Sequence, residues 1–397
     1  MKFCIIIPDG MADYKLEKLG GRTPLEAART PFLDNISYNG SLGLVQTVPK
    51  KFTPGSDIAC LSVLGYDPKV YYTGRAPLEA ASLGMDLRKE EYAVRCNLVS
   101  VHNDILEDFS AGHITDNEAK SIISTLNEKL GNDTIRFHTG KGYRNIMIYN
   151  GDSEMDAVCT PPHDIIGKPI ERNLPKGKGS EILIDLMRNS QQILENHDVN
   201  KVRRDLDENP ANMIWLWGQG HRPDMPPFKE MYGLSGAVIT GVDLLRGIAT
   251  YLGWNIINVP GATGYLDTNY NAKAQYAIEA IETHDMVLVH IEAPDEASHE
   301  GNIYEKIRAI ENIDSKIIGP VYNALKKYNA FRILVLPDHY TSIQEKTHTP
   351  DPVPFATYGT DSVKKSKLSF TESNAKRGAK IKKGYKLMRH FIKGDIS

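Results

Sequence analysis

The sequence is poor in cysteine, and its few cysteines form no pattern. There are four in 397 residues: Cys4, Cys60, Cys96 and Cys159. No two of them have the C-x-x-C spacing that is typical of redox pairs and structural zinc sites. A disulfide framework is therefore not expected. We expect reduced thiols in a cytoplasmic protein.

Long hydrophobic runs, signal sequences and an excess of charge are also missing. No apolar stretch approaches the roughly 20 residues that span a membrane. The opening MKFCIIIPDGM lacks the pattern of a secretory signal, because Pro8 and Asp9 interrupt its apolar run. The formal net charge of −3 gives no reason to expect nucleic acid as a partner. Small metabolites remain as the expected partners, and the sequence does not indicate an oligomeric state.

Short apolar runs alternate with amphipathic segments along most of the chain. Runs of this kind, without polar alternation, are typical of parallel strands that helices cover on both faces. The pattern predicts an α/β fold with a mostly parallel sheet flanked by helices. The predicted strands are residues 3–7, 213–217, 254–259, 286–291 and 331–336, and the predicted helices include residues 237–253, 272–285 and 304–328.

The middle of the chain differs, because hairpin-like strands surround a single predicted helix there. At roughly 150 residues per domain, the length also suggests about two domains. We therefore expect a core domain formed by residues 1–88 and 176–397, with a smaller α+β domain, residues 89–175, inserted into it. The run at 213–217 is expected to belong to the core sheet.

Acidic and histidine side chains follow three of the predicted core strands, at the point where each strand ends. They are Asp9, Asp295, His299, Asp338 and His339. Taken singly, such residues are usually turn or helix caps, or solvated loop residues. Together they should converge, because the carboxyl ends of parallel strands meet at one edge of the sheet. Carboxylates and imidazoles are the ligands of divalent transition metals, so the conjunction predicts a metal site.

Two further residues are candidates for the same site. His348 lies in the Pro-rich segment KTHTPDPVPF, where an irregular loop could carry it to the metals. Ser56 follows the turn at Pro54–Gly55 and begins a predicted short helix. Two roles are possible for Ser56: a helix N-cap, which is common, or a nucleophile that a metal activates.

These motifs resemble a known family. PDGM near the start, PGSD around Ser56, D-x-x-x-H after one late strand, PDH after the next and T-H-x-x-D-P-V-P together resemble the alkaline-phosphatase superfamily. More closely, with LGGRTPLEAARTP, LSVLGYDP and YTGRAPLEA, they resemble cofactor-independent phosphoglycerate mutases of the archaeal type. The resemblance covers essentially the whole chain. It implies that the protein has an alkaline-phosphatase-like core with an inserted cap domain.

The resemblance implies two divalent metal ions, manganese foremost, with magnesium, cobalt or zinc as alternatives. It assigns one ion to Asp295, His299 and His348, and the other to Asp9, Ser56, Asp338 and His339. Ser56 would take the phosphoryl group of 3-phosphoglycerate and return it to the other hydroxyl, giving 2-phosphoglycerate without 2,3-bisphosphoglycerate. This is an isomerase reaction of glycolysis and gluconeogenesis, and the inserted domain would act as a lid against water.

One segment departs from the archaeal pattern. Where those mutases have an arginine-rich stretch, this chain reads EDFSAGHIT, with Phe109, Ser110 and His113. In this respect the chain is similar to a bacterial branch proposed to include homoserine kinases. No G-x-x-x-x-G-K-[ST] phosphate loop is present to bind a nucleotide donor. Because the EDFSAGHIT segment leaves the substrate open, a homoserine kinase-like phosphotransferase and a metal-dependent phosphatase are alternatives to the mutase. The missing phosphate loop counts against the kinase.

Candidate substrate-binding residues are His113, Arg144 and Arg222. Each could recognise an anionic substrate, and arginine binds phosphate and carboxylate groups in a bidentate way. The alternative for each is an exposed, solvated side chain.

Overall fold

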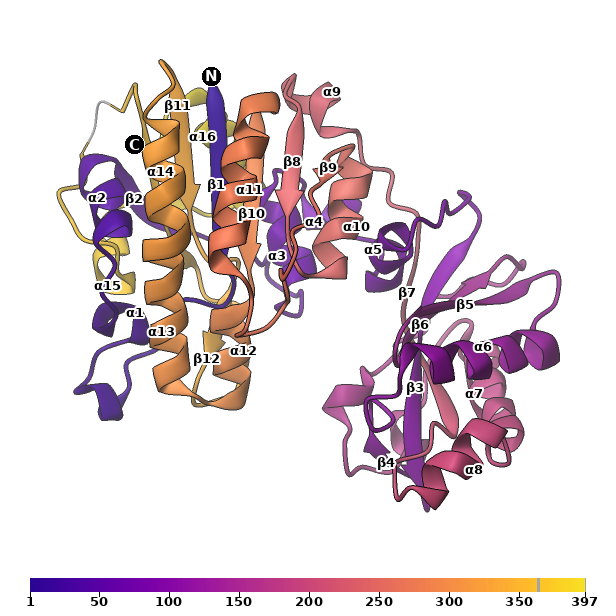
Figure 1. The fold of residues 1–397 in the computed structure, drawn as a ribbon. Helices are drawn as coiled ribbons and strands as arrows, with labels where there is room; N and C mark the ends of the chain where they lie inside the picture. Colours follow the sequence, from indigo (N-terminus) through magenta and orange to yellow (C-terminus); the bar gives the residue numbers. More distant parts are fainter. Residues whose placement is uncertain (363–364, 397) are drawn as a thin grey trace. The chain divides into compact units, whose positions relative to one another are not determined.

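The computed structural model describes residues 1–362 and 365–396. Its internal contacts divide the chain into two units, each with its own sheet and core (Figure 1). The first unit contains Met1–Tyr72 and Met225–Ser397, and the second contains Thr73–Asp224.

The first unit is built on an eight-stranded sheet. Only β14 runs antiparallel to its neighbours within this sheet, so the predicted α/β fold with a mostly parallel sheet is confirmed. In spatial order the strands are β15 (Ala379–Ile381), β2 (Ser41–Val45), β14 (Val353–Gly359), β11 (Phe331–Val335), β1 (Lys2–Pro8), β10 (Met286–Ile291), β8 (Gly236–Ile239) and β9 (Asn255–Ile256).

The register of the central strands positions the candidate site. In β1, Ile7 lies opposite His290 of β10, and Ile6 lies opposite Val335 of β11. The three strands are parallel and end at nearly the same level, so the segments that follow them leave the sheet at one edge. The apolar residues of these strands are almost fully buried, which explains their lack of polar alternation.

Helices cover this sheet and provide the rest of the core. Figure 1 shows α11 (Tyr270–Thr283) in front of β1 and β10, beside the long helical stretch of α13 (Ile303–Ile313) and α14 (Gly319–Leu325). A π-helical turn at Asp314–Ile318 joins α13 to α14, ahead of Pro320. The helices predicted over 272–285 and 304–328 are thus present.

The prediction for residues 237–253 is wrong in its first part. The segment begins as strand β8, and helix α10 (Asp243–Leu252) starts only afterwards. The apolar Ala-Val-Ile run is buried in the sheet, and an acidic residue in the first helical turn suits the positive end of the helix dipole. The strand predicted at 254–259 is reduced to the two residues of β9 at the sheet edge.

The second unit contains an antiparallel sheet with helices packed on it. The strands and the helix expected between residues 90 and 149 are present. The strands are β3 (Tyr92–His102), β4 (Ile105–Asp108), β5 (Ile135–Lys141), β6 (Arg144–Tyr149) and β7 (Met213–His221), and the principal helices are α6 (Asp116–Leu130), α7 (Ser180–Leu194) and α8 (Asp198–Asp205).

The second unit is longer than residues 89–175, and the boundary prediction is corrected at both ends. The run at 213–217 lies in β7, which pairs with β3 of this unit instead of joining the core sheet. Helix α7 packs against β7 and therefore belongs to the same unit. An apolar run predicts a buried strand, but the run alone does not say which sheet it will join.

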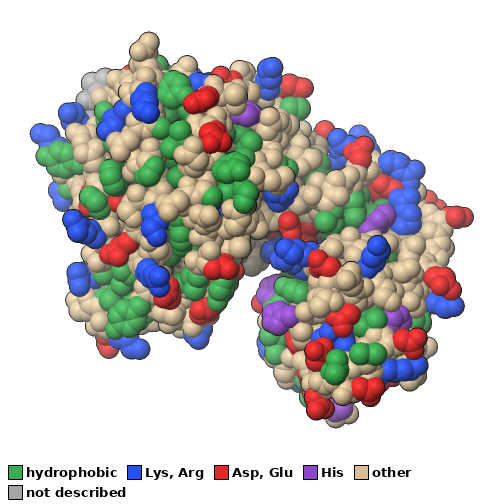
Figure 2. All heavy atoms as spheres, viewed as in Figure 1, with side chains coloured by type: hydrophobic (Ala, Val, Ile, Leu, Met, Phe, Trp, Pro, Cys, Tyr) green, Lys and Arg blue, Asp and Glu red, His purple; other side chains and the backbone are tan. Residues whose placement is uncertain are grey.

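The surface of the molecule carries both signs of charge. Figure 2 shows Lys and Arg interspersed with Asp and Glu across the visible face. Among the helices of residues 1–362 and 365–396, none has the length and apolar character needed to cross a membrane.

Candidate metal centre

The residues predicted to converge do meet beyond the carboxyl ends of β1, β10 and β11. They form two groups of metal-ligating side chains, and within each group the ligand atoms all lie within 4.8 Å of one another. The first group is Asp295, His299 and His348, and the second is Asp9, Asp338 and His339.

The first group is organised by helix α12 (Ala293–Glu300). This helix places Asp295 and His299 one turn apart, with His299 Nε2 3.1 Å from Asp295 Oδ2. His348 Nε2 lies 3.4 Å from Asp295 Oδ1 and 3.0 Å from His299 Nε2. Burial disfavours a charged Asp295, but hydrogen bonds and positive charge from protonated His299 and His348 outweigh it and lower the pKa of this carboxyl well below its ordinary value.

The far nitrogens of both imidazoles face backbone carbonyls. His299 Nδ1 lies 2.9 Å from the carbonyl oxygen of Lys346, and His348 Nδ1 lies 3.3 Å from that of Pro54. A neutral imidazole that donates its Nδ1–H to a carbonyl keeps its Nε2 lone pair free. Metal-binding histidines are commonly oriented in this way.

His348 reaches the site from a short strand, not from an irregular loop. It lies in β13 (Thr347–Thr349), which pairs antiparallel with β12 (Tyr340–Ser342), and it stands opposite Thr341. The pairing of β13 with β12 fixes the position of His348 next to the segment that carries Asp338 and His339.

The second group is fully buried. Asp9, Asp338 and His339 are all 0% exposed, and His339 Nε2 lies 3.3 Å from Asp338 Oδ2 and 3.5 Å from Asp9 Oδ1. Burial, reinforced by the Asp338 and Asp295 carboxylates, raises the pKa of Asp9 well above its ordinary value. Asp9 Oδ1 also has no hydrogen-bond partner among the described residues. Buried carboxylates of this kind fit a bound cation. A cation offsets both the repulsion between the carboxylates and the hydration that they lose on burial.

Ser56 is the first residue of helix α3 (Ser56–Val63), and its hydroxyl faces the second group. Its Oγ lies 3.3 Å from Asp9 Oδ2 and 3.1 Å from His339 Nε2. Gly55 occupies the N-cap position, and no side chain caps this helix. The N-cap alternative for Ser56 is therefore not what the structure shows. The helix N-terminus beside Ser56 favours negative charge, such as that of a phosphoryl group.

Two residues at this site were not predicted from the sequence. Thr341 Oγ1 donates to Asp295 Oδ1 at 2.5 Å and lies 3.2 Å from His339 Nδ1, so it connects the two groups. His290, inside β10, places its Nε2 3.1 Å from Asp9 Oδ2. A histidine in the otherwise apolar run MVLVHI was the available signal, but a buried structural histidine gives the same pattern.

The three candidate substrate-binding residues lie in the second unit and do not form one cluster. Arg144 lies opposite Asn97 of β3, whereas His221, next to Arg222, lies opposite Tyr92. Five residues of extended strand correspond to about 17 Å. Arg222 pairs with Asp86 at 2.8 Å. His113 is exposed and has a positive φ of 52°.

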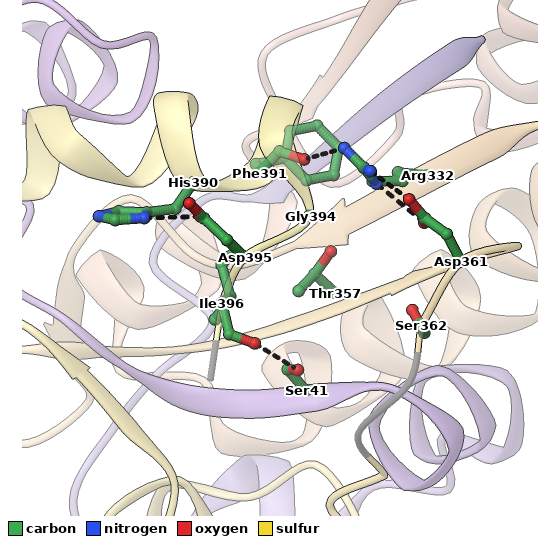
Figure 3. Close-up of a pocket in the computed structure, with 10 residues that line it drawn as sticks. All are labelled: Ser41, Arg332, Thr357, Asp361, Ser362, His390, Phe391, Gly394, Asp395 and Ile396. Atoms are coloured by element: carbon green, nitrogen blue, oxygen red, sulfur yellow. Dashed lines mark hydrogen bonds and ion pairs between the residues drawn. The ribbon is translucent and has the colours of Figure 1, made fainter.

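A separate pocket lies at the opposite end of β11, where Arg332 stands near the start of the strand (Figure 3). The Arg332 guanidinium pairs with Asp361 and donates to the carbonyl oxygens of Phe391 and Ile392 in α16 (Leu387–Lys393). His390 pairs with Asp395 at 2.8 Å. These charges are already satisfied, and the contacts anchor the last helix to the sheet.

Fold and site together define an α/β protein in which carboxylates, imidazoles and a serine hydroxyl gather in an arrangement that could hold divalent metal ions. The family model described as 2,3-bisphosphoglycerate-independent phosphoglycerate mutase matches residues 38–200. The chain belongs to this family, as its similarity to curated members over nearly its full length shows. Membership implies dependence on divalent metal ions and independence of bisphosphoglycerate.

Three similar proteins illustrate the relationship. The chain is 51% identical to the 2,3-bisphosphoglycerate-independent phosphoglycerate mutase of Methanosarcina barkeri, over 96% of both chains. It is 50% identical to the enzyme of the same name from Methanothrix thermoacetophila, over 99% of this chain and 100% of the relative. The solved cofactor-independent phosphoglycerate mutase of Thermoplasma acidophilum is 28% identical, with a TM-score of 0.66 over 99% of each chain.

Proposed function

We propose that this protein interconverts 3-phosphoglycerate and 2-phosphoglycerate, with Ser56 as the transient phosphoryl acceptor. The observation that carries the proposal is the position of Ser56 Oγ. It stands at a helix N-terminus, 3.3 Å from Asp9 Oδ2 and 3.1 Å from His339 Nε2. The substrate would be a small phosphorylated metabolite, and the protein would act in the cytoplasm.

Two divalent ions fit the donor sets. Asp295, His299 and His348 would hold one, and Asp9, Ser56, Asp338 and His339 would hold the other. When bound, such ions lower the pKa of a ligating hydroxyl and neutralise charge on the transferred phosphoryl group. We favour manganese, and the same oxygen and nitrogen ligands also accept magnesium, cobalt or zinc.

The protein's own groups account for the rest of the reaction. Ser56 Oγ attacks the phosphorus of 3-phosphoglycerate, the bond to the C3 oxygen breaks, and glycerate leaves with a proton on that oxygen. The C2 hydroxyl of glycerate then attacks phosphoserine, and Ser56 recovers its proton. The positive end of α3 favours the negative charge of the phosphoryl group throughout. No water is consumed, so no free phosphate should appear.

The proposed substrate-binding residues are His113, Arg144 and Arg222. Among them, Arg144 is exposed, and its guanidinium lies over the Tyr143 ring, 5.5 Å from the centroid. Arg222 is engaged by Asp86, and we rank it behind Arg144 and His113.

Phosphorus NMR tests the proposal directly. With manganese and 3-phosphoglycerate alone, the wild type should produce 2-phosphoglycerate and no free phosphate. Ser56→Ala should lose roughly 10³-fold or more of the turnover, as expected for a nucleophile. Ser62→Ala is a matched control, because Ser62 is a buried serine of the same helix.

Parallel samples with homoserine and ATP, and with phosphoglycerate followed for phosphate release, separate the alternatives. Phosphorylation of homoserine alone would refute the substrate assignment. Full turnover by Ser56→Ala would refute the mechanism.

A further inference from the structure

A third group of metal-ligating atoms adjoins the two already described. Cys60, His290 and Asp338 offer ligand atoms that all lie within 4.8 Å of one another, and all three residues are buried. Cys60 Sγ lies 3.9 Å from Asp338 Oδ2. The three residues come from α3, from β10 and from the segment after β11, so the tertiary fold alone brings them together.

The Nε2 nitrogen of His290 forms no hydrogen bond among the described residues. The side chain is 0% exposed, and Nε2 has no hydrogen-bond partner among the described residues, although Asp9 Oδ2 is 3.1 Å away. A buried polar atom without a partner costs about 1–3 kcal/mol, so its position needs an explanation.

The other nitrogen of His290 explains how Nε2 could act as a ligand. Nδ1 lies 3.4 Å from Thr240 Oγ1, which accepts from the Val242 N–H at 3.0 Å. The hydroxyl oxygen has a second lone pair, so it can also accept the Nδ1–H of His290. In that tautomer the lone pair is at Nε2, and a hydrogen bond at the far nitrogen is the usual arrangement for a metal-binding histidine.

Cys60 adds a thiol to the imidazole of His290 and the carboxylate of Asp338. It lies one helical turn after Ser56 in α3, so both side chains are on the same side of the helix. Its Sγ is buried and faces the carboxylate of Asp338. A thiol is only a weak hydrogen-bond donor, so this contact does little for a buried carboxylate unless a cation lies between them.

We propose that Cys60, His290 and Asp338 form a third, wholly buried metal position in this protein. Asp338 joins it to the Asp9–Asp338–His339 group, and in this respect the inference rests on the proposed two-metal function. A set with one thiolate, one imidazole and one carboxylate favours zinc or cobalt over manganese or magnesium. The third position would thus differ in metal preference from the two beside it, and its ion would neutralise the carboxylates behind Ser56.

Cobalt loading of the metal-free protein tests this. The wild type should bind three Co²⁺ per chain and show a near-ultraviolet thiolate-to-cobalt charge-transfer band. Cys60→Ser should abolish the band, whereas Cys4→Ser, a change of a buried cysteine in β1, should keep it. His290→Leu should reduce the bound cobalt to two per chain.

The outcomes separate this proposal from the mutase proposal. A band in the wild type that disappears only with Cys60 supports the third position, even if phosphoglycerate is not a substrate. A mutase that is fully active, binds two ions and shows no band refutes the third position alone. Because the wild-type spectrum and stoichiometry need no substitution, a variant that fails to fold does not remove the test.

Discussion

The hydroxyl of Thr341 offers a way to test whether the two predicted metal positions are coupled. Its Oγ1 donates to Asp295 Oδ1 at 2.5 Å and lies 3.2 Å from His339 Nδ1, and the side chain is fully buried. Thr341→Val preserves the shape of the side chain and removes only this polar atom. Asp295 should then lose part of its orientation, and His339 should lose the partner of Nδ1, the nitrogen opposite the proposed ligand atom Nε2.

The magnitude follows from the hydrogen bond. A hydrogen bond to a charged group contributes about 1.5–3 kcal/mol, and about 1.4 kcal/mol corresponds to tenfold in an equilibrium constant. The expected weakening of metal binding is therefore roughly 10- to 100-fold, which agrees with the usual effect of removing a partner of a metal ligand.

Competition with a chelator measures the affinity for Mn²⁺ or Co²⁺. Thr341→Ser should bind metal nearly as tightly as the wild type, because it keeps the hydroxyl. Thr357→Val, at a buried threonine of β14, should change the affinity less than twofold. If Thr341→Val binds metal as tightly as the wild type, Thr341 does not orient the ligands.

Two further predictions concern stability. Arg332→Met should lower the free energy of unfolding by about 2 kcal/mol, because the buried guanidinium binds Asp361 and the last carbonyls of α16. An unchanged midpoint of urea denaturation would contradict this. Burial raises the pKa of Glu372 to about 7 from 4.5, so its protonated form favours the folded state. Stability from this group is present below pH 4.5 and is lost as the pH rises through 7. Glu372→Gln should therefore be more stable than the wild type at pH 8, by at most about 3 kcal/mol, and the difference should shrink toward pH 4.5. Urea unfolding at both pH values measures it, and a difference that is independent of pH would refute the reasoning.

The sequence by itself determined the fold class and most of the candidate site. Buried parallel strands are marked by unbroken apolar runs, and β1, β10 and β11 were recognisable for this reason. The carboxyl ends of parallel strands lie at one edge of the sheet, so the sequence alone predicted that the Asp and His residues just beyond them lie close together. Pro54 and Gly55 placed Ser56 at a helix start, and Ser56 became a candidate nucleophile only together with the predicted metal ligands.

Only the tertiary structure decided the remaining features. Cys60 and His290 lie in buried parts of a helix and a strand, where a ligand and an ordinary core residue have the same sequence signature. Thr341 matters through contacts with Asp295 and His339, and the first of these is 46 residues away. The run at 213–217 joined the second unit because pairing with β3 depends on which strand edge is free, and local hydrophobicity does not encode that.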